Sequence, residues 1–258
     1  MERSLQSPKI AEKSPVYRPP YDSPIEDDFA YNAVKYLRKD IALVPQHKVR
    51  TYCGTFRVDF LIASKELSIA IECDGRAFHQ TRSRDLARDT LILGSHAVNT
   101  IFRLQGNNIY YRIGDCLFLL SQCCPHLFTD RGMANLKALA TPETRAQADV
   151  HGRPFIEVEH SIIDDEQAGI FHDSDEVPWT LRFRAHSLRP ANYYHYMFKE
   201  FWEIVRYREL RSFVEVRNLL SDPIKTIDQH IAWLQTLGPI GRANYENKIA
   251  ARQHELYG

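Results

Sequence analysis

Residues 55–75, TFRVDFLIASKELSIAIECDG, contain the pattern that decides the fold. Residues 55–63 and 67–73 are rich in branched and aromatic side chains, which is typical of β-strands. The polar triplet SKE separates the two runs. The stretch therefore predicts an antiparallel hairpin whose turn centres on Lys65 and Glu66.

Two carboxylates interrupt these apolar strands: Asp59 lies in RVDF and Glu72 in IECDG. A turn centred on Lys65 and Glu66 places Asp59 opposite Glu72, and opposed side chains have Cβ atoms about 4.5–5.5 Å apart. Like charges at that distance are destabilising unless a cation or a proton lies between them. Asp74 follows Glu72 by two residues and therefore points to the same face. The sequence thus predicts three converging acids, which can bind Mg²⁺ through oxygen.

Helical and extended patterns on both sides of the hairpin complete an α/β unit. A helix is predicted from Ser23, because Ser23, Pro24 and Glu26 have the pattern of a capping box with proline at the first helical position. Further elements follow from periodicity and stop signals: an end of this helix near Lys39, a strand from Leu43, a helix from Ser83 to Gly94, a strand over 97–104 and a helix over 113–123. The order α-β-β-β-α-β-α predicts a compact α/β unit that ends near residue 128.

Composition divides the chain into four parts. Residues 1–22 are rich in proline and poor in apolar anchors, which predicts an extended or disordered arm. Residues 23–128 are the α/β unit. Acidic residues dominate 143–176, so 129–178 are interpreted as an acidic linker or a small β element around FIEVEHSII. The helical periodicity of residues 179–258 predicts a helical accessory domain.

The accessory region has a surplus of aromatic residues. The run YYHYMFKEFWEIVRYREL, residues 193–210, contains more aromatic rings than one helix face usually buries. Two interpretations stay open. The rings form a hydrophobic core, as is usual, or they form an interface with a protein partner or with a second copy in a homodimer.

The charge and hydropathy of the whole chain exclude some classes of protein. Its 258 residues include 33 Lys and Arg and 33 Asp and Glu. A general electrostatic coat for nucleic acid is therefore excluded, although a local basic face is not. The longest clean apolar run, CLFLL, is far shorter than the roughly 20 residues that cross a bilayer. Five cysteines without regular spacing describe no disulfide framework. We expect a cytoplasmic protein with no membrane association.

Several sequence blocks, in chain order, resemble a known family: SPIEDDF, PQHKV, RVDF, IAIECDGRAFH, RSRDLARDTLILG and IFRLQGNNI. Together they resemble the very-short-patch-repair-like branch of the PD-(D/E)XK nuclease superfamily, over residues 23–123. The resemblance implies a restriction-endonuclease-like mixed sheet flanked by helices, followed here by a mostly helical accessory region. It also implies a metal-dependent endonuclease that hydrolyses phosphodiesters with Mg²⁺ (or Mn²⁺), in DNA rather than RNA.

The resemblance also implies roles for individual residues. Asp59 matches the motif aspartate, Glu72 the glutamate of the E-x-K element, and Glu26 the helical acid that often completes the metal site. Asp74 stands where most of the superfamily has lysine, although this branch commonly has E-x-D-G. The group that activates water is therefore left open between the metal itself and His79 as a general acid or base, and Asp74 is a further metal ligand.

The predicted nucleic-acid contacts are four polar or basic side chains: Gln46, Arg84, Arg88 and Arg103. Gln46 matches a polar position that recurs in the branch, and the arginines can bind phosphate. Pairing of these arginines with Asp85 and Asp89 on a solvated helix face is the alternative.

The sequence supports two hypotheses about function. The first is a metal-dependent nuclease, acting in repair, in a mobile element or in antiphage defence. The second is a catalytically silent subunit that binds nucleic acid or takes part in an assembly. The nuclease is the leading hypothesis, and the neutral overall charge and the large accessory half keep the second one open.

Overall fold

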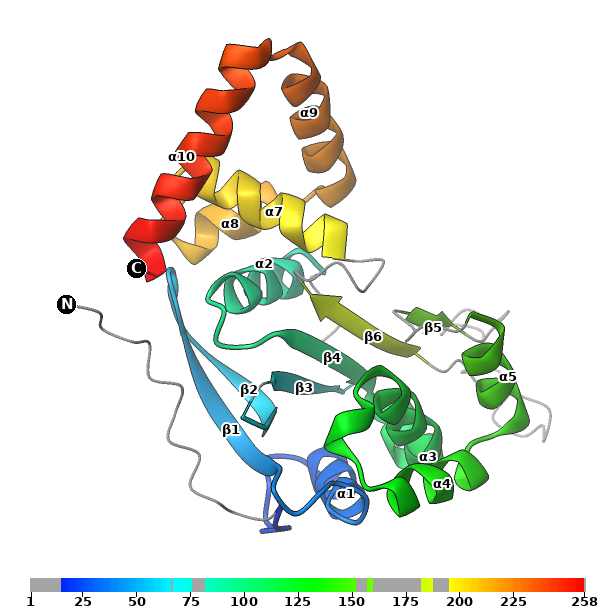
Figure 1. Cartoon of the computed structure of the whole chain (residues 1–258). Helices are drawn as coiled ribbons and strands as arrows, with labels where there is room; N and C mark the ends of the chain where they lie inside the picture. The colour runs from blue at the N-terminus through cyan, green and yellow to red at the C-terminus, as the bar shows by residue number, and fades with distance from the viewer. Residues whose placement is uncertain are drawn as a thin grey trace, which may run out of the picture.

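A mixed β-sheet lies at the centre of the computed structural model, which describes residues 15–65, 67–75, 82–151, 157–159, 182–187 and 195–257. The strand order is β1-β2-β3-β4-β6-β5 (Figure 1). The strands are β1 (Ala42–Thr51), β2 (Gly54–Ala63), β3 (Ser68–Asp74), β4 (Thr100–Gln105), β5 (Glu157–Glu159) and β6 (Arg182–Ser187). β3 and β4 are parallel, whereas the other neighbouring strands are antiparallel.

Helices cover both faces of this sheet (Figure 1). The helices that pack on or near it are α1 (Pro24–Ala33), α2 (Arg82–Gly94), α3 (Gly106–Cys123), α4 (Asp130–Leu139) and α5 (Pro142–His151). The C-terminal region contains α7 (His195–Tyr207), α8 (Phe213–Leu219), α9 (Pro223–Thr236) and α10 (Pro239–Tyr257). The chain is therefore an α/β protein with a helical C-terminal region, as expected.

Alternation along β3 divides the hydrophobic residues between two cores. Ile69 and Ile71 belong to a core that α1 and α3 complete. Ala70 points the other way, into a second core formed with α2, α7 and α8. Because successive side chains of a strand face opposite sides of a sheet, a strand that is apolar at nearly every position must be covered on both faces. This explains why the run SIAIEC shows no polar alternation.

The predicted hairpin is confirmed, with its register. Phe60 pairs with Ile71 and Ala63 pairs with Ser68, as a turn centred between Lys65 and residue 66 requires. The predicted element order α-β-β-β-α-β-α is also confirmed, in the form α1-β1-β2-β3-α2-β4-α3.

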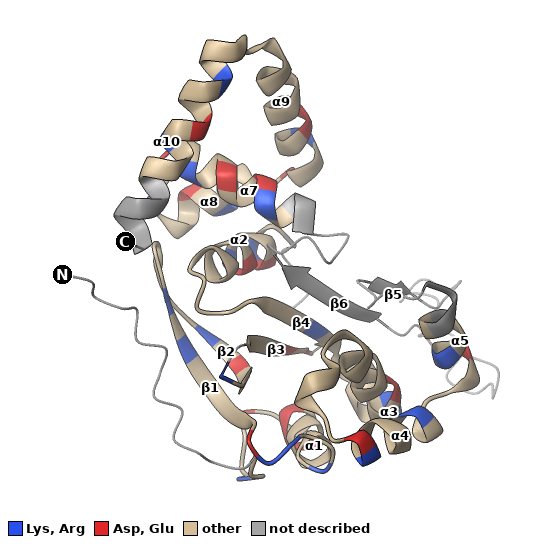
Figure 2. Ribbon diagram, viewed as in Figure 1, with Lys and Arg blue, Asp and Glu red and all other residues tan. Residues whose placement is uncertain are grey.

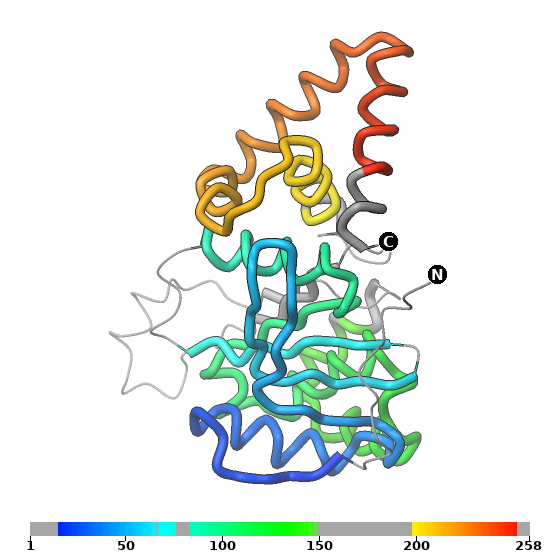
Figure 3. Tube along the Cα trace, turned by 90° about the vertical axis from the view of Figure 1, so that its left-hand side faces the viewer, coloured from blue at the N-terminus to red at the C-terminus, as the bar shows by residue number. Residues whose placement is uncertain are grey.

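The β1–β2 hairpin bends where it meets the rest of the sheet (Figure 3). Pairing runs through Pro45↔Phe60 and resumes at His47↔Val58, so that Gln46 and Asp59 fall between paired positions. Gln46 has a positive φ of 51°, a left-handed conformation that is uncommon outside glycine. Beyond this point the hairpin continues to its tip and reaches α8, where Phe56 and Phe213 are in ring contact.

Two predicted helix boundaries were wrong. The first helix ends at Ala33 rather than near Lys39, because Leu37 forms a β-bridge with Phe128 and draws the chain away from the helix axis. The helix predicted over 113–123 begins earlier, at Gly106, with a kink at Arg112 (φ −139°, ψ 37°). The predicted stretch is the part of α3 that follows this kink.

The predicted division of the C-terminal half needs correction. Residues 129–178 were interpreted as an acidic linker or small β element, but α4 and α5 occupy much of this stretch, and α4 adds Leu136 to the first core. β5 lies within the predicted strand, at the sheet edge. The accessory region is helical from α7 onward, yet β6 precedes these helices and pairs with β4. The sheet therefore crosses the predicted boundary at residue 178.

The N-terminal arm is described only from residue 15. Residues 15–22 have no helix or strand, but Tyr17 and Tyr21 pack against the first core. All five cysteines are free, in agreement with the absence of a disulfide framework. In the part of the chain that the structure describes, no helix is long and apolar enough to cross a membrane.

The aromatic surplus of the accessory region is largely hydrophobic core. Phe198 and Phe201 are fully buried and Trp202 is 3% exposed. Tyr207 stacks with Trp233 and Tyr245. These rings join α7 to α2 and to the last two helices, so they are already used in packing. Tyr193 and Tyr194 lie outside the described residues, as does the side chain of Tyr196.

Replacing Gly94 should loosen the contact between α2 and α7. A Cβ atom at Gly94 would lie 2.5 Å from ring atoms of Trp202, whereas one at Gly238 would meet nothing within 4 Å. Overpacking of this kind costs about 1–3 kcal/mol. We expect Gly94→Ala to lower the free energy of unfolding in urea by that amount and Gly238→Ala to leave it nearly unchanged. Equal stabilities for the two variants would contradict the packing described.

Candidate functional site

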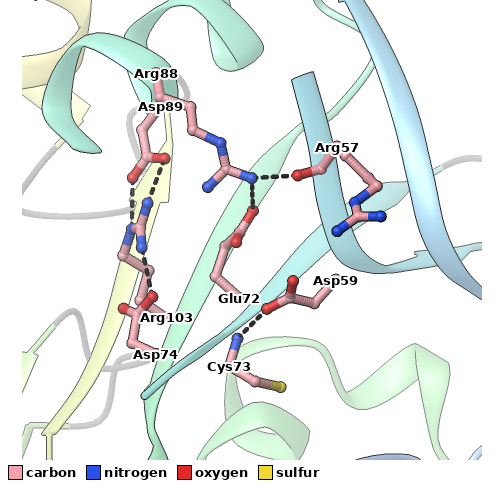
Figure 4. A network of polar contacts seen from close by, with 8 residues as sticks. All are labelled: Arg57, Asp59, Glu72, Cys73, Asp74, Arg88, Asp89 and Arg103. Carbon is pink, nitrogen blue, oxygen red and sulfur yellow. Dashed lines mark hydrogen bonds and ion pairs between the residues drawn. The ribbon is translucent and has the colours of Figure 1, made fainter. Parts of the chain in front are cut away.

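The two central acids lie where β2 and β3 diverge (Figure 4). When the β2–β3 register is continued by one residue beyond Phe60↔Ile71, Asp59 faces Glu72. The Oδ2 atom of Asp59 accepts a hydrogen bond from the backbone N–H of Cys73 at 2.7 Å. This bond holds the Asp59 carboxylate against β3, next to the residue that bears the second carboxylate.

Arg88 on α2 neutralises Glu72. Glu72 is 4% exposed, and its Oε1 accepts from Nη2 of Arg88 at 2.7 Å. The same Nη2 donates to the backbone carbonyl of Arg57. Arg88 therefore joins α2, β2 and β3 at a single nitrogen. Its side chain keeps 18% of its surface exposed, so this guanidinium borders the solvent.

A second, deeper arginine lies beside the first. Arg103 on β4 donates to both carboxylate oxygens of Asp89, at 2.8 and 2.9 Å, and to Oδ1 of Asp74 at 2.7 Å. The parallel register Glu72↔Arg103 places its side chain on the Glu72 face of the sheet. Asp89 is fully buried and Arg103 is 6% exposed. Such a desolvated pair needs several hydrogen bonds to offset its lost hydration, and the bidentate contact supplies them.

Glu26 approaches the cluster from α1. Ser23 caps this helix by accepting a hydrogen bond from the Glu26 backbone N–H, and its hydroxyl donates to Oε1 of Glu26 at 2.8 Å. Nε2 of Gln46, at the bend of β1, donates to Oε2 of Glu26 at 2.6 Å. Glu26 is 5% exposed and its charge is felt at Asp59. Glu26 can therefore take part in the helix cap and also lie close to the other acids.

The acids are held in an environment that disfavours their charge. The pKa of Asp59 is raised to about 6, mainly by burial and also by the neighbouring Glu26 and Asp74, against the opposing effects of the Cys73 hydrogen bond and Arg88. Burial likewise raises the pKa of Glu72 to about 8, although Arg88 and Arg103 oppose the shift. A carboxyl with a raised pKa gains more than a solvated one from a nearby cation.

The donor set suits a hard divalent cation. Glu26, Asp59, Glu72 and Asp74 offer oxygen atoms, the ligands that Mg²⁺ prefers. The Oε1 atom of Gln46 is buried and has no hydrogen-bond partner among the residues that the structure describes. No three or more His, Cys, Asp or Glu side chains in the described ranges are grouped to hold a metal ion as they stand. Arginines hold oxygens of two of the four acids, so a metal would compete with them.

The structure places most of the predicted site residues. Asp59 lies near enough to Glu26 for that charge to act on it, and near enough to Glu72 to act on Glu72 in turn, whereas Asp74 is turned toward Arg103. His79 lies outside the described residues. The predicted nucleic-acid contacts have several environments: Gln46 binds Glu26, Arg88 binds Glu72, Arg103 is buried, and Arg84 is exposed on α2.

Asp89 differs from the sequence-based expectation. It was interpreted as a solvated partner for the helix arginines, but it is fully buried between α2 and β4. Its position in the sequence indicates burial. Asp89 follows Leu86 by three residues and precedes Leu93 by four, so it lies on the apolar stripe of the helix.

Comparisons of the chain with protein-family models, with curated proteins and with solved structures find no match. Its functional interpretation therefore depends on its own residues and their geometry.

Removing the charge of Asp59 should change the pH dependence of stability. Asp59 ionises at about pH 6 in the folded chain and near 3.8 when unperturbed, so stability is lost as the pH rises through this window. Asp59→Asn keeps an acceptor for Cys73. We expect it to be more stable than the wild type at pH 8, by about 1–3 kcal/mol, and equal to it below pH 4. Asp228→Asn, on exposed α9, should show no such pH-dependent difference in thermal unfolding.

Removing the buried guanidinium of Arg103 should lower the free energy of unfolding. Arg103→Met leaves Asp89 desolvated and unpaired, which typically costs about 3–5 kcal/mol. The matched control is Arg38→Met, because Arg38 forms a comparable pair with Asp40 on the open surface, where such pairs contribute little. Urea unfolding of both variants measures the difference. An Arg103→Met variant as stable as the control would show that the network is not structural.

Proposed function

We propose that this protein is a metal-dependent nuclease that hydrolyses phosphodiester bonds, a DNA endonuclease acting in repair, in a mobile element or in antiphage defence. The observation that carries the proposal is the pair Asp59 and Glu72, facing each other on adjacent strands with pKa values of about 6 and 8. Burying two facing carboxylates is costly, and a bound cation would offset that cost.

The arrangement of elements supports the same proposal. The resemblance implies a restriction-endonuclease-like fold, and the chain has the order α1-β1-β2-β3-α2-β4 with a mixed sheet flanked by helices. The acids lie on the second and third strands, and Glu26 lies on the preceding helix. Strands and helices fix side chains more tightly than loops do, as a metal site demands.

The chain's own residues divide the work as follows. Asp59 and Glu72 would hold a Mg²⁺ (or Mn²⁺) ion, with Glu26 and Asp74 at its sides. When bound, such an ion polarises the scissile phosphate and lowers the pKa of the attacking water. Gln46 orients Glu26, and Arg103 orients Asp74. Arg88, freed from Glu72, would supply positive charge near the phosphate in place of the missing lysine.

A second candidate function has one specific observation in its favour. Arg88 and Arg103 already neutralise Glu72 and Asp74, as they would in a site that had exchanged its metal for internal cations. In that case the chain is a catalytically silent subunit that binds nucleic acid or takes part in an assembly. The two functions differ in metal binding, which calorimetry with Mg²⁺ or Mn²⁺ measures directly.

Cleavage of labelled single- and double-stranded DNA and RNA tests the proposed nuclease. We expect cutting with Mg²⁺ or Mn²⁺, none with EDTA, and a loss of at least about 100-fold in Glu72→Gln. The matched control is Glu246→Gln, on exposed α10, which should cut like the wild type. Asp59→Asn should fail in the same way as Glu72→Gln.

Two results would contradict the proposed nuclease. Cutting that persists in both Glu72→Gln and Asp59→Asn would locate the chemistry elsewhere. Failure of the wild type to cut any substrate, together with no metal binding by calorimetry, would favour the silent subunit.

A further inference from the structure

Three basic side chains lie on one outer face of the β1–β2 hairpin. Lys48 pairs directly with Arg57 across the two strands, and Arg50 lies two residues beyond Lys48 on the same face. Lys48 and Arg50 are exposed, and the Arg57 side chain is 57% exposed. Figure 2 shows Lys and Arg positions on both strands of this hairpin. We call Lys48, Arg50 and Arg57 the basic stripe.

The stripe is an unfavourable arrangement for the isolated protein. Like charges directly opposite each other in an antiparallel pair destabilise the sheet, and Lys48 faces Arg57 in this way. Within the part of the chain that the structure describes, neither Lys48 nor Arg50 has an acidic partner. Only Arg57 does: its Nη2 lies 2.9 Å from Oδ2 of Asp22. An arrangement that costs stability and faces solvent favours an anionic ligand.

The stripe leads toward Glu26, the member of the acidic cluster (Glu26, Asp59, Glu72 and Asp74) that lies on α1. The opposite face of the hairpin carries Val49 and Val58, which are buried in the second core, so the stripe faces the side of α1. Gln46 reaches the same side, because it donates to Glu26 on α1. Along β1, the order from the cluster outward is therefore Gln46, Lys48, Arg50, in steps of roughly 7 Å. The bend at Gln46 joins the stripe to the candidate site.

We propose that the basic stripe binds the phosphodiester backbone of the nucleic acid and leads it to the acidic cluster. This inference rests on the proposed function and deepens it, because it names the surface that holds the substrate. Regular spacing along one strand matches a ligand with repeating charge, and the chain's overall neutrality makes this basic face local. Phosphate contacts of this kind position a nucleic acid without reading its sequence.

Asp22 competes with the ligand for Arg57. The pair is exposed on both sides, with Asp22 52% exposed, so solvent weakens it and a phosphate can replace the carboxylate. Asp22 directly precedes the cap of α1, next to the acidic cluster. Loss of its charge should therefore strengthen binding of the nucleic acid, which is the opposite of the effect of losing Lys48 or Arg50.

Binding measured without catalysis tests the stripe. The full-length protein is titrated into a fluorescein-labelled DNA duplex in EDTA, and anisotropy is followed at several salt concentrations. We expect Lys48→Gln/Arg50→Gln to weaken binding at least tenfold and to reduce the slope of log affinity against log salt by about two. The control is Arg131→Gln/Lys137→Gln, which removes the same charge from exposed positions on α4. It should change neither quantity appreciably.

A second pair of variants tests the direction of the effect. Asp22→Asn should tighten binding severalfold, whereas Asp228→Asn, with the same change in charge on α9, should not. Thermal unfolding shows that each variant is folded, and the stripe variant should be at least as stable as the wild type, because it loses a like-charge pair. Equal losses in the stripe and control double variants would overturn the proposal, as would a wild type that does not bind.

These outcomes separate the stripe from the nuclease. Stripe-dependent binding without metal-dependent cutting would sustain the stripe and overturn the proposed catalysis. Cutting that depends on Glu72 but is unaffected by Lys48→Gln/Arg50→Gln at low substrate concentration, with unaffected binding, would sustain the nuclease and overturn the stripe.

Discussion

The buried contact between Arg103 and Asp89 is the constraint around which the site is organised. It joins β4 to α2 through two hydrogen bonds in a region from which water is excluded. The same guanidinium reaches Asp74 at the end of β3. Three elements are thereby fixed relative to one another, and Glu72 lies on β3 between them. A lysine has no planar fork and could not make this set of contacts.

Several carboxylates gather around this anchor. Among the residues that the structure describes, Glu26, Asp59, Glu72, Asp74 and Asp89 lie in the region of the guanidinium groups of Arg88 and Arg103. Burial is the main cause of the raised pKa values of Asp59 and Glu72, and neighbouring acids add to it while the arginines oppose it. A protein under selection for stability alone would replace such acids with apolar residues. The presence of Asp59 and Glu72 on packed strands favours a functional cause over a structural one.

The sequence was sufficient to predict the local features of the fold and site, but not the features that depend on contacts between distant residues. The facing of Asp59 and Glu72 followed from turn position and the two-residue period of a strand, both of which are local. The bend at Gln46 did not follow from the sequence, because it combines a left-handed backbone with a contact to Glu26, 20 residues away on α1. Asp89 was misjudged because its partner is on a strand that follows it. β6 pairs with β4 although the two strands are far apart in sequence, and periodicity cannot predict such a pairing.

A hydrolase that acts on a polyanion meets an electrostatic conflict. The acids that hold a metal repel the phosphates that must approach it, and at close range in a poorly solvated site this repulsion is weakly screened. The bend at Gln46 offers a structural solution, because it places the exposed charges of Lys48, Arg50 and Arg57 beside the acids without burying them. If the chain is the proposed nuclease, attraction would act along the hairpin, where the substrate backbone would lie, and the acids would face the single phosphate that reaches them. The formal net charge of the chain is zero, yet the outer face of this hairpin is locally positive and the neighbouring site is locally acidic.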